Sequence, residues 1–64
     1  MHERLKQIRH ETGKTIKEVS SDLGMTISAY AHYEQGIREP SIDILKKICV
    51  YFGVSADYLN GLED

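Results

Sequence analysis

The sequence predicts an all-α fold, a compact bundle of five short helices. Glycine and proline residues cut the 64-residue chain into pieces of helical length. Apolar residues in these pieces recur three or four positions apart, and almost no stretch alternates with a period of two. Threonine or serine residues stand where helices would begin, as N-caps do. A chain of this length forms at most one domain, so we expect residues 1–64 to fold as a single unit.

The first helix is predicted over residues 2–12, where Leu5 and Ile8 form an apolar i, i+3 pair. A capping box, Thr15-Ile16-Lys17-Glu18, then opens a second helix over residues 16–23. The apolar face of that helix is an i, i+4 pair formed by Val19 and Leu23.

Three further pieces complete the predicted bundle. Thr26 can cap a third helix over residues 27–34. Pro40-Ser41 marks the start of a fourth helix, whose core-facing residues are expected to be Ile44, Leu45, Ile48, Cys49 and Phe52. Ser55 can cap a short fifth helix that includes Tyr58 and Leu59.

Composition narrows the class of protein. The only cysteine, Cys49, lies in an apolar run and is expected to be a buried structural thiol, which suits a reducing cytoplasm. No apolar stretch approaches the roughly 20 residues of a membrane span, and the charged N-terminus does not resemble a signal peptide. A cytoplasmic protein with no membrane contact is therefore expected.

The charges are unevenly distributed. The formal net charge is −2, which counts mildly against a nucleic-acid partner. Residues 1–17, however, carry five Lys or Arg against two Glu, whereas residues 57–64 carry three acids and no base. Because the distribution of charge matters more than its sum, a nucleic-acid partner stays open.

The sequence offers no constellation for catalysis. No serine lies in a nucleophile elbow, and no glycine-rich phosphate loop is present. His2, His10 and His32 lack the spacing of metal ligands, and Glu63 and Asp64 are adjacent acids that we interpret as solvated. We therefore expect no enzyme, no metal and no cofactor, and a core of this size leaves little room for a small-molecule ligand.

The connection between the second and third predicted helices is the most specific feature. Only Gly24-Met25-Thr26 joins them, so the helices must cross steeply. Ser20 provides a small residue at the crossing, and Gly24 tolerates a positive φ in the turn. Apolar side chains can fill the angle: Val19, Leu23, Met25, Tyr30 and Tyr33. This pattern is typical of a helix-turn-helix.

Helical geometry divides the third predicted helix into two faces. Tyr30, Tyr33 and Glu34 turn toward the body of the domain. The outward face consists of Ile27, Ser28, Ala31, His32 and Gln35. Small residues are not needed on a face that only meets solvent, whereas a face that enters a groove about 12 Å wide requires them. The pattern favours the major groove of DNA.

These segments resemble the Cro/repressor-type helix-turn-helix domain, the XRE family of bacterial and phage transcriptional regulators. The resemblance covers nearly the whole chain and is most distinctive in YEQGIREPS; it also includes RLKQIRHETGKT, KEVSSDLGMT and LKKICVYFGVSADYLNG. It implies a five-helix fold and a repressor that binds double-stranded operator DNA as a homodimer, with the third helix in the major groove.

The resemblance also implies roles for particular residues. Base contacts fall to Ile27, Ser28 and His32. Phosphate contacts fall to Thr15, Ile16, Gln35, Ile37 and Arg38. Lys14 and Lys17 flank the start of the second helix and are also expected to meet phosphate. Arg9 and Glu34 occupy the positions of an internal ion pair between the first and third helices.

The dimer surface is expected where aromatic and aliphatic side chains gather near the end of the chain: Tyr51, Tyr58, Leu59 and Leu62. An alternative is a protein-interaction module on the same fold, an antirepressor or the partner subunit of a regulatory pair. It is favoured by the acidic balance and by three isoleucines at positions where the family often has a polar contact: Ile16, Ile27 and Ile37. An antitoxin or a restriction-control regulator would bind DNA and fits the same sequence.

Overall fold

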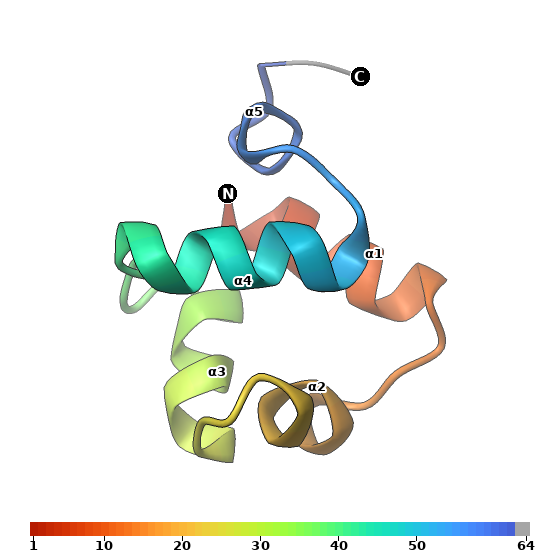
Figure 1. The fold of residues 1–64 in the computed structure, drawn as a ribbon, viewed down its shortest axis with the longest axis vertical. Coiled ribbons are helices and arrows are strands. Elements are labelled where there is room, and N and C mark those ends of the chain that lie inside the picture. Colours follow the sequence, from red (N-terminus) through yellow and green to blue (C-terminus); the bar gives the residue numbers. More distant parts are fainter. Residues whose placement is uncertain (63–64) are drawn as a thin grey trace.

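The computed structural model describes residues 1–62 and confirms the all-α prediction (Figure 1). Within this part of the chain there are five helices and no strand: α1 (His2–Glu11), α2 (Ile16–Asp22), α3 (Ile27–Glu34), α4 (Ile42–Phe52) and α5 (Ala56–Leu59). The three helices whose bounds were predicted from sequence end within one residue of the prediction. Figure 1 shows α4 crossing the bundle, with α2 and α5 on opposite sides of it.

Four of the helices begin at a side-chain cap. The hydroxyl oxygens of the cap residues accept a hydrogen bond from the backbone amide three residues later, and these caps are Thr15, Thr26, Ser41 and Ser55. Each cap satisfies an amide that the first turn of a helix leaves without an intrahelical partner. The short helices are therefore fixed at their starts by local sequence.

Every helix contributes to one hydrophobic core. Its buried apolar members are Leu5, Val19, Leu23, Tyr30, Tyr33, Ile48 and Leu59. In α4 only Ile48 is fully buried, whereas Ile44, Leu45, Cys49 and Phe52 are half-buried at the edge of the core. The prediction of a buried Cys49 thiol was therefore wrong in degree, because α4 lies across the bundle and keeps one side in solvent. Partial burial still raises the pKa of the Cys49 thiol.

One residue of the predicted dimer surface is misplaced. Leu59 has no exposed area, because α5 turns it into the core against α1 and α4, so it cannot contact a second copy. Tyr51 and Tyr58 are half-buried, and the guanidinium of Arg4 lies 4.8 Å from the centre of the Tyr58 ring. Leu62 is 75% exposed. These three remain predictions for a dimer surface.

The turn between α2 and α3 requires glycine for its backbone conformation. Gly24 has a φ of 72°, and a Cβ built there would meet no atom within 4 Å. The Gly24 and Met25 amides donate to the carbonyls of Ser21 and Ser20 at 3.1 and 2.9 Å. The constraint is therefore the left-handed backbone itself and not a lack of space.

We expect Gly24→Val to lower the free energy of unfolding by about 1–2 kcal/mol, because a β-branched residue is strained at positive φ. In a domain of this size that corresponds to a fall in melting temperature of about 4–8 °C per kcal/mol. Thermal denaturation followed by circular dichroism measures it. Gly24→Asn, which tolerates the left-handed region, should lose less stability. An unchanged melting temperature for the valine variant would show that the turn is not under this constraint.

Candidate nucleic-acid interface

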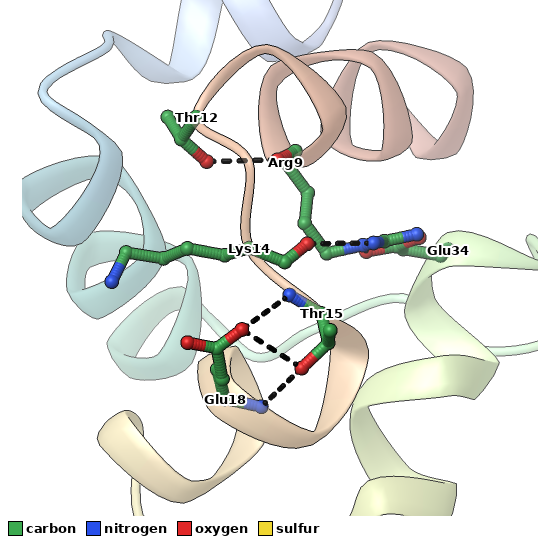
Figure 2. A network of polar contacts seen from close by, with 6 residues as sticks. All are labelled: Arg9, Thr12, Lys14, Thr15, Glu18 and Glu34. Atoms are coloured by element: carbon green, nitrogen blue, oxygen red, sulfur yellow. Dashed lines mark hydrogen bonds and ion pairs between the residues drawn. The ribbon is translucent and has the colours of Figure 1, made fainter.

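Arg9 fixes the position of α3 relative to α1. Its Nε and Nη2 atoms donate to the two carboxylate oxygens of Glu34 at 2.7 and 3.0 Å (Figure 2). Its Nη1 atom donates to the Lys14 carbonyl at 2.9 Å. Both side chains of the ion pair are nearly buried, with 10% and 3% exposed. The predicted pair is confirmed, and one guanidinium also ties α1 to the loop before α2.

The guanidinium of Arg9 is charged, and the phenol of Tyr30 beside it is neutral. The hydrogen bond to Glu34 raises the pKa of Arg9, which keeps the guanidinium charged. Burial raises the pKa of Tyr30, so its phenol stays neutral in the core beside the pair. The inward face of α3 is therefore held by a charged, bidentate contact and by buried aromatic rings, which leaves its other face to present side chains outward.

The outward face of α3 has the composition that the sequence predicted. Tyr30, Tyr33 and Glu34 are buried, as expected for the inward face. On the other side Ser28, His32 and Gln35 are exposed, Ile27 is 51% exposed and Ala31 is half-buried. None of these outward residues is acidic, so the face carries no carboxylate that would repel phosphates. It is a surface of short and uncharged side chains plus one histidine.

The loop after α3 folds back onto the end of that helix. The amides of Ile37 and Arg38 both donate to the His32 carbonyl, at 3.1 and 3.3 Å. Arg38 is exposed, and its backbone amide is held against the last turn of α3 by the His32 carbonyl. A guanidinium in this position can reach a phosphate beside a groove that α3 occupies. Ile37 next to it is 68% exposed.

The start of α2 is closed by the predicted capping box, which is confirmed (Figure 2). The Thr15 hydroxyl accepts from the Glu18 amide at 3.1 Å and donates to the Glu18 carboxylate at 3.1 Å, while the Thr15 amide donates to the same carboxylate at 3.0 Å. The Thr15 amide, followed by its hydroxyl, lowers the pKa of Glu18, which therefore stays ionised. A phosphate here would meet a like charge, which counts against the predicted contact by Thr15.

Lys14 is directed away from α3. Its ammonium lies 5.7 Å from the centre of the Tyr51 ring, and Figure 2 shows the side chain extending toward α4 while Glu34 lies on the other side. The Tyr51 hydroxyl donates to the Asp22 carboxylate at 2.6 Å. This arrangement counts against a phosphate contact by Lys14 beside α3, whereas Lys17 on α2 is exposed. Asp22 and Tyr51 are 29 residues apart, and no sequence pattern predicted their contact.

Residues 1–62 contain neither a metal-ion cluster nor a membrane-spanning helix. No group of three His, Cys, Asp or Glu side chains gathers there in a way that could hold a metal ion. None of the helices in this range combines the length and the apolar character that crossing a membrane requires. The candidate functional site is the surface built by α2, α3 and the following loop, where the outward side chains of α3 are exposed.

Comparison with known proteins agrees with this geometry. Residues 5–59 match the family described as Helix-turn-helix. The chain is 36% identical over 61 residues to the HTH-type transcriptional regulator ImmR of Bacillus subtilis (strain 168), which covers 95% of this chain and 48% of ImmR. It is 39% identical over 57 residues to the SPbeta prophage-derived uncharacterized HTH-type transcriptional regulator YonR of the same organism, covering 89% of this chain and 53% of YonR.

The match to the family extends from α1 to α5, whereas the relatives are longer proteins. The chain spans about half the length of the curated relatives that it matches. A comparison with solved structures found no significant match. The family match covers most of the chain and includes the turn at Gly24 and the Arg9–Glu34 pair. The chain therefore belongs to the helix-turn-helix family, of the XRE type that its sequence resembles.

Proposed function

We propose that this chain is a sequence-specific DNA-binding transcriptional regulator whose α3 enters the major groove. The observation that carries this proposal is the outward face of α3, which is small, free of acids and borne by a helix that Arg9 holds in place. A helix with short outward side chains can approach base edges closely. The names of ImmR and YonR as transcriptional regulators support the same role for this chain.

This proposal assigns chemical roles to exposed residues of the site. Ser28 and His32 lie one helical turn apart and reach base edges, because a hydroxyl and an imidazole can each donate or accept a hydrogen bond. Ile27 meets the methyl group of a thymine. The phosphate contacts fall to three exposed residues: Lys17 on α2, and Gln35 and Arg38 after the end of α3.

The proposal includes a dimer on operator DNA. One α3 presents few groups that discriminate between bases, and a genome offers a very large number of competing sites. Two copies that read half-sites one helical turn apart multiply the selectivity of a single copy. Repression requires only that such a dimer occupy the operator, so we propose a repressor.

A second candidate is a protein-interaction module on the same fold. It is favoured by two apolar side chains at the candidate interface, since Ile27 is 51% and Ile37 is 68% exposed. Exposed apolar groups of this size are common at protein interfaces and contribute little to phosphate binding. In this case the outward face of α3 would bind a partner protein.

Selection from a random DNA pool, followed by affinity measurement over a range of salt concentrations, separates the two candidates. If Lys17 and Arg38 each neutralise one phosphate, a dimer makes about four such contacts and releases about four counterions. The slope of log affinity against log salt concentration should then be about −4. We expect an enriched sequence and this moderate slope. A pool without enrichment and a slope near zero would contradict DNA recognition and would support a protein partner.

A further inference from the structure

A contact between the start of α1 and the loop after α3 lies outside the residues that are given DNA contacts. The imidazole of His2 packs against the backbone of Gly36. A Cβ built on Gly36 would be 2.9 Å from Nδ1 of the ring and 3.1 Å from its Cγ and Cε1 atoms. So close an approach is possible because residue 36 has no side chain. The two residues are far apart in the sequence, and no sequence pattern predicted their contact.

The loop itself contributes little packing. Residues 35–39 are all exposed, and Ile37 is 68% exposed. The amides of Ile37 and Arg38 share one acceptor, the His32 carbonyl, at 3.1 and 3.3 Å. Hydrogen bonds at exposed backbone with few buried contacts open readily. A side chain that packs on the loop from another element therefore has a large share in fixing its conformation.

His2 is carried by a helix that is fixed in the core. It is the first residue of α1, and Leu5 of the same helix is fully buried and donates its amide to the Met1 carbonyl at 3.1 Å. Arg9 fastens α1 to α3 through its bidentate contact. The His2 side chain is 45% exposed, and its Nε2 atom lies 3.7 Å from the Glu3 carboxylate. The ring therefore meets the loop from a support that does not move with the loop.

The contact lies next to a residue of the candidate site. A small hollow of about 70 Å³ is lined by Met1, His2, Tyr33, Gly36, Arg38 and Glu39. Arg38 thus borders the same hollow as the imidazole, and only one residue separates it from Gly36. A change in the backbone at Gly36 is transmitted to Arg38 through two peptide units, which are planar and rigid.

We propose that His2 is a positioning residue, which holds the loop after α3 in the conformation that brings Arg38 to a phosphate. A loop that is already ordered loses less conformational entropy when it binds. The inference rests on the proposed function for the role of Arg38. The holding of the loop by His2 is a property of the free chain, so the two are measured separately, with and without DNA.

Amide hydrogen exchange of the free chain, followed by NMR, tests the holding of the loop. In His2→Ala the amides of Ile37 and Arg38 should exchange about fivefold faster or more, because the loop opens more often. The Glu18 amide, which donates to the Thr15 hydroxyl at the start of α2, should exchange as before. His2→Phe restores a flat ring against Gly36 and should slow the exchange of the two loop amides again.

The affinity for DNA, measured by fluorescence anisotropy, tests the positioning of Arg38. His2→Ala should weaken binding to a selected duplex and to a scrambled one alike, by about fivefold or more, because a phosphate contact carries no sequence information. In a chain that already has Arg38→Ala, the same substitution should change the affinity by less than about twofold, since no guanidinium is left to position. His2→Phe should bind like the unmodified chain.

His10→Ala is the matched control, because His10 is an exposed histidine in the last turn of the same helix and does not line the hollow. It should leave exchange and affinity unchanged. Equal exchange of the loop amides in His2→Ala and the unmodified chain would overturn the proposal, as would a loss of affinity of the same size with and without Arg38. If the unmodified chain binds no duplex, the proposed function fails and the positioning of Arg38 fails with it, whereas faster exchange in His2→Ala still supports the contact with the loop.

Discussion

Replacing Glu34 by alanine is expected to leave the domain close to unfolding at room temperature. The Arg9 side chain is only 10% exposed, so the substitution would leave a buried guanidinium without its counter-ion. Breaking a buried ion pair from one side costs about 3–5 kcal/mol. A domain of 64 residues has a free energy of unfolding of roughly 3–10 kcal/mol in total. Urea denaturation followed by circular dichroism measures the loss.

The double variant Arg9→Met with Glu34→Leu is the control for this prediction. Exchanging both members of a buried pair for apolar residues of similar volume is often neutral or stabilising, so most of the lost stability should return. The Lys14 carbonyl, which loses its donor in this variant, is only partly buried and can be hydrated. A Glu34→Ala chain that unfolds at the same urea concentration as the unmodified chain would show that the pair does not hold α1 to α3.

Ser28→Asp is expected to abolish DNA binding without harming the fold. The residue is exposed at the second position of α3, where a carboxylate interacts favourably with the helix N-terminus by about 0.3–1 kcal/mol. In the major groove the same carboxylate lies between two rows of phosphates, and like charges at an interface cost several kcal/mol. Affinity should therefore fall by more than about a hundredfold. Fluorescence anisotropy measures the affinity, and thermal denaturation measures the fold.

Asn60→Asp adds the same charge at an exposed position after α5, outside the candidate interface. Because salt screens exposed charges beyond about 8–10 Å, its affinity for DNA should change little. If Ser28→Asp and Asn60→Asp bind DNA equally well, the outward face of α3 does not approach the duplex.

The parts of the fold that the sequence predicted are those that depend on near neighbours. The capping box at Thr15 and Glu18 involves residues three positions apart, and the caps at Thr26 and Ser55 act over the same distance. The turn needs a residue that adopts positive φ, and Gly24 identifies it. Such local signals determine where helices begin and end, so the five helices could be placed from sequence.

The errors arise where the result depends on how helices pack. The half-buried state of Cys49 and the complete burial of Leu59 follow from the way α4 and α5 lie on the core, which residue spacing does not determine. Spacing identifies the apolar side of a helix and leaves open how deeply a neighbour covers it. The Arg9–Glu34 pair joins residues 25 apart and was predicted only through the family resemblance.

At the candidate site, too, the features that follow from helical periodicity were predicted, whereas some features that depend on contacts with other side chains were not. The outward face of α3 was predicted correctly because helical periodicity alone separates it from the buried tyrosines. The contacts expected of Thr15 and Lys14 depend on groups elsewhere. The Thr15 hydroxyl donates a hydrogen bond to the Glu18 carboxylate, and the ammonium of Lys14 lies over the ring of Tyr51 on α4. The predicted capping box already places Glu18 beside Thr15, so the first effect could be inferred from sequence, whereas the contact of Lys14 with Tyr51 joins residues far apart in the chain and could not.

The ratio of affinities for a selected duplex and a scrambled one decides whether α3 reads sequence. Base contacts carry sequence information and phosphate contacts do not. We predict that His32→Ala, like Ser28→Ala, costs about 1–3 kcal/mol on the selected duplex and lowers the ratio by about 5–150-fold. Arg38→Ala should weaken both complexes alike and leave the ratio unchanged. Equal losses on both duplexes for His32→Ala and Ser28→Ala, with the ratio unchanged, would contradict sequence reading by α3.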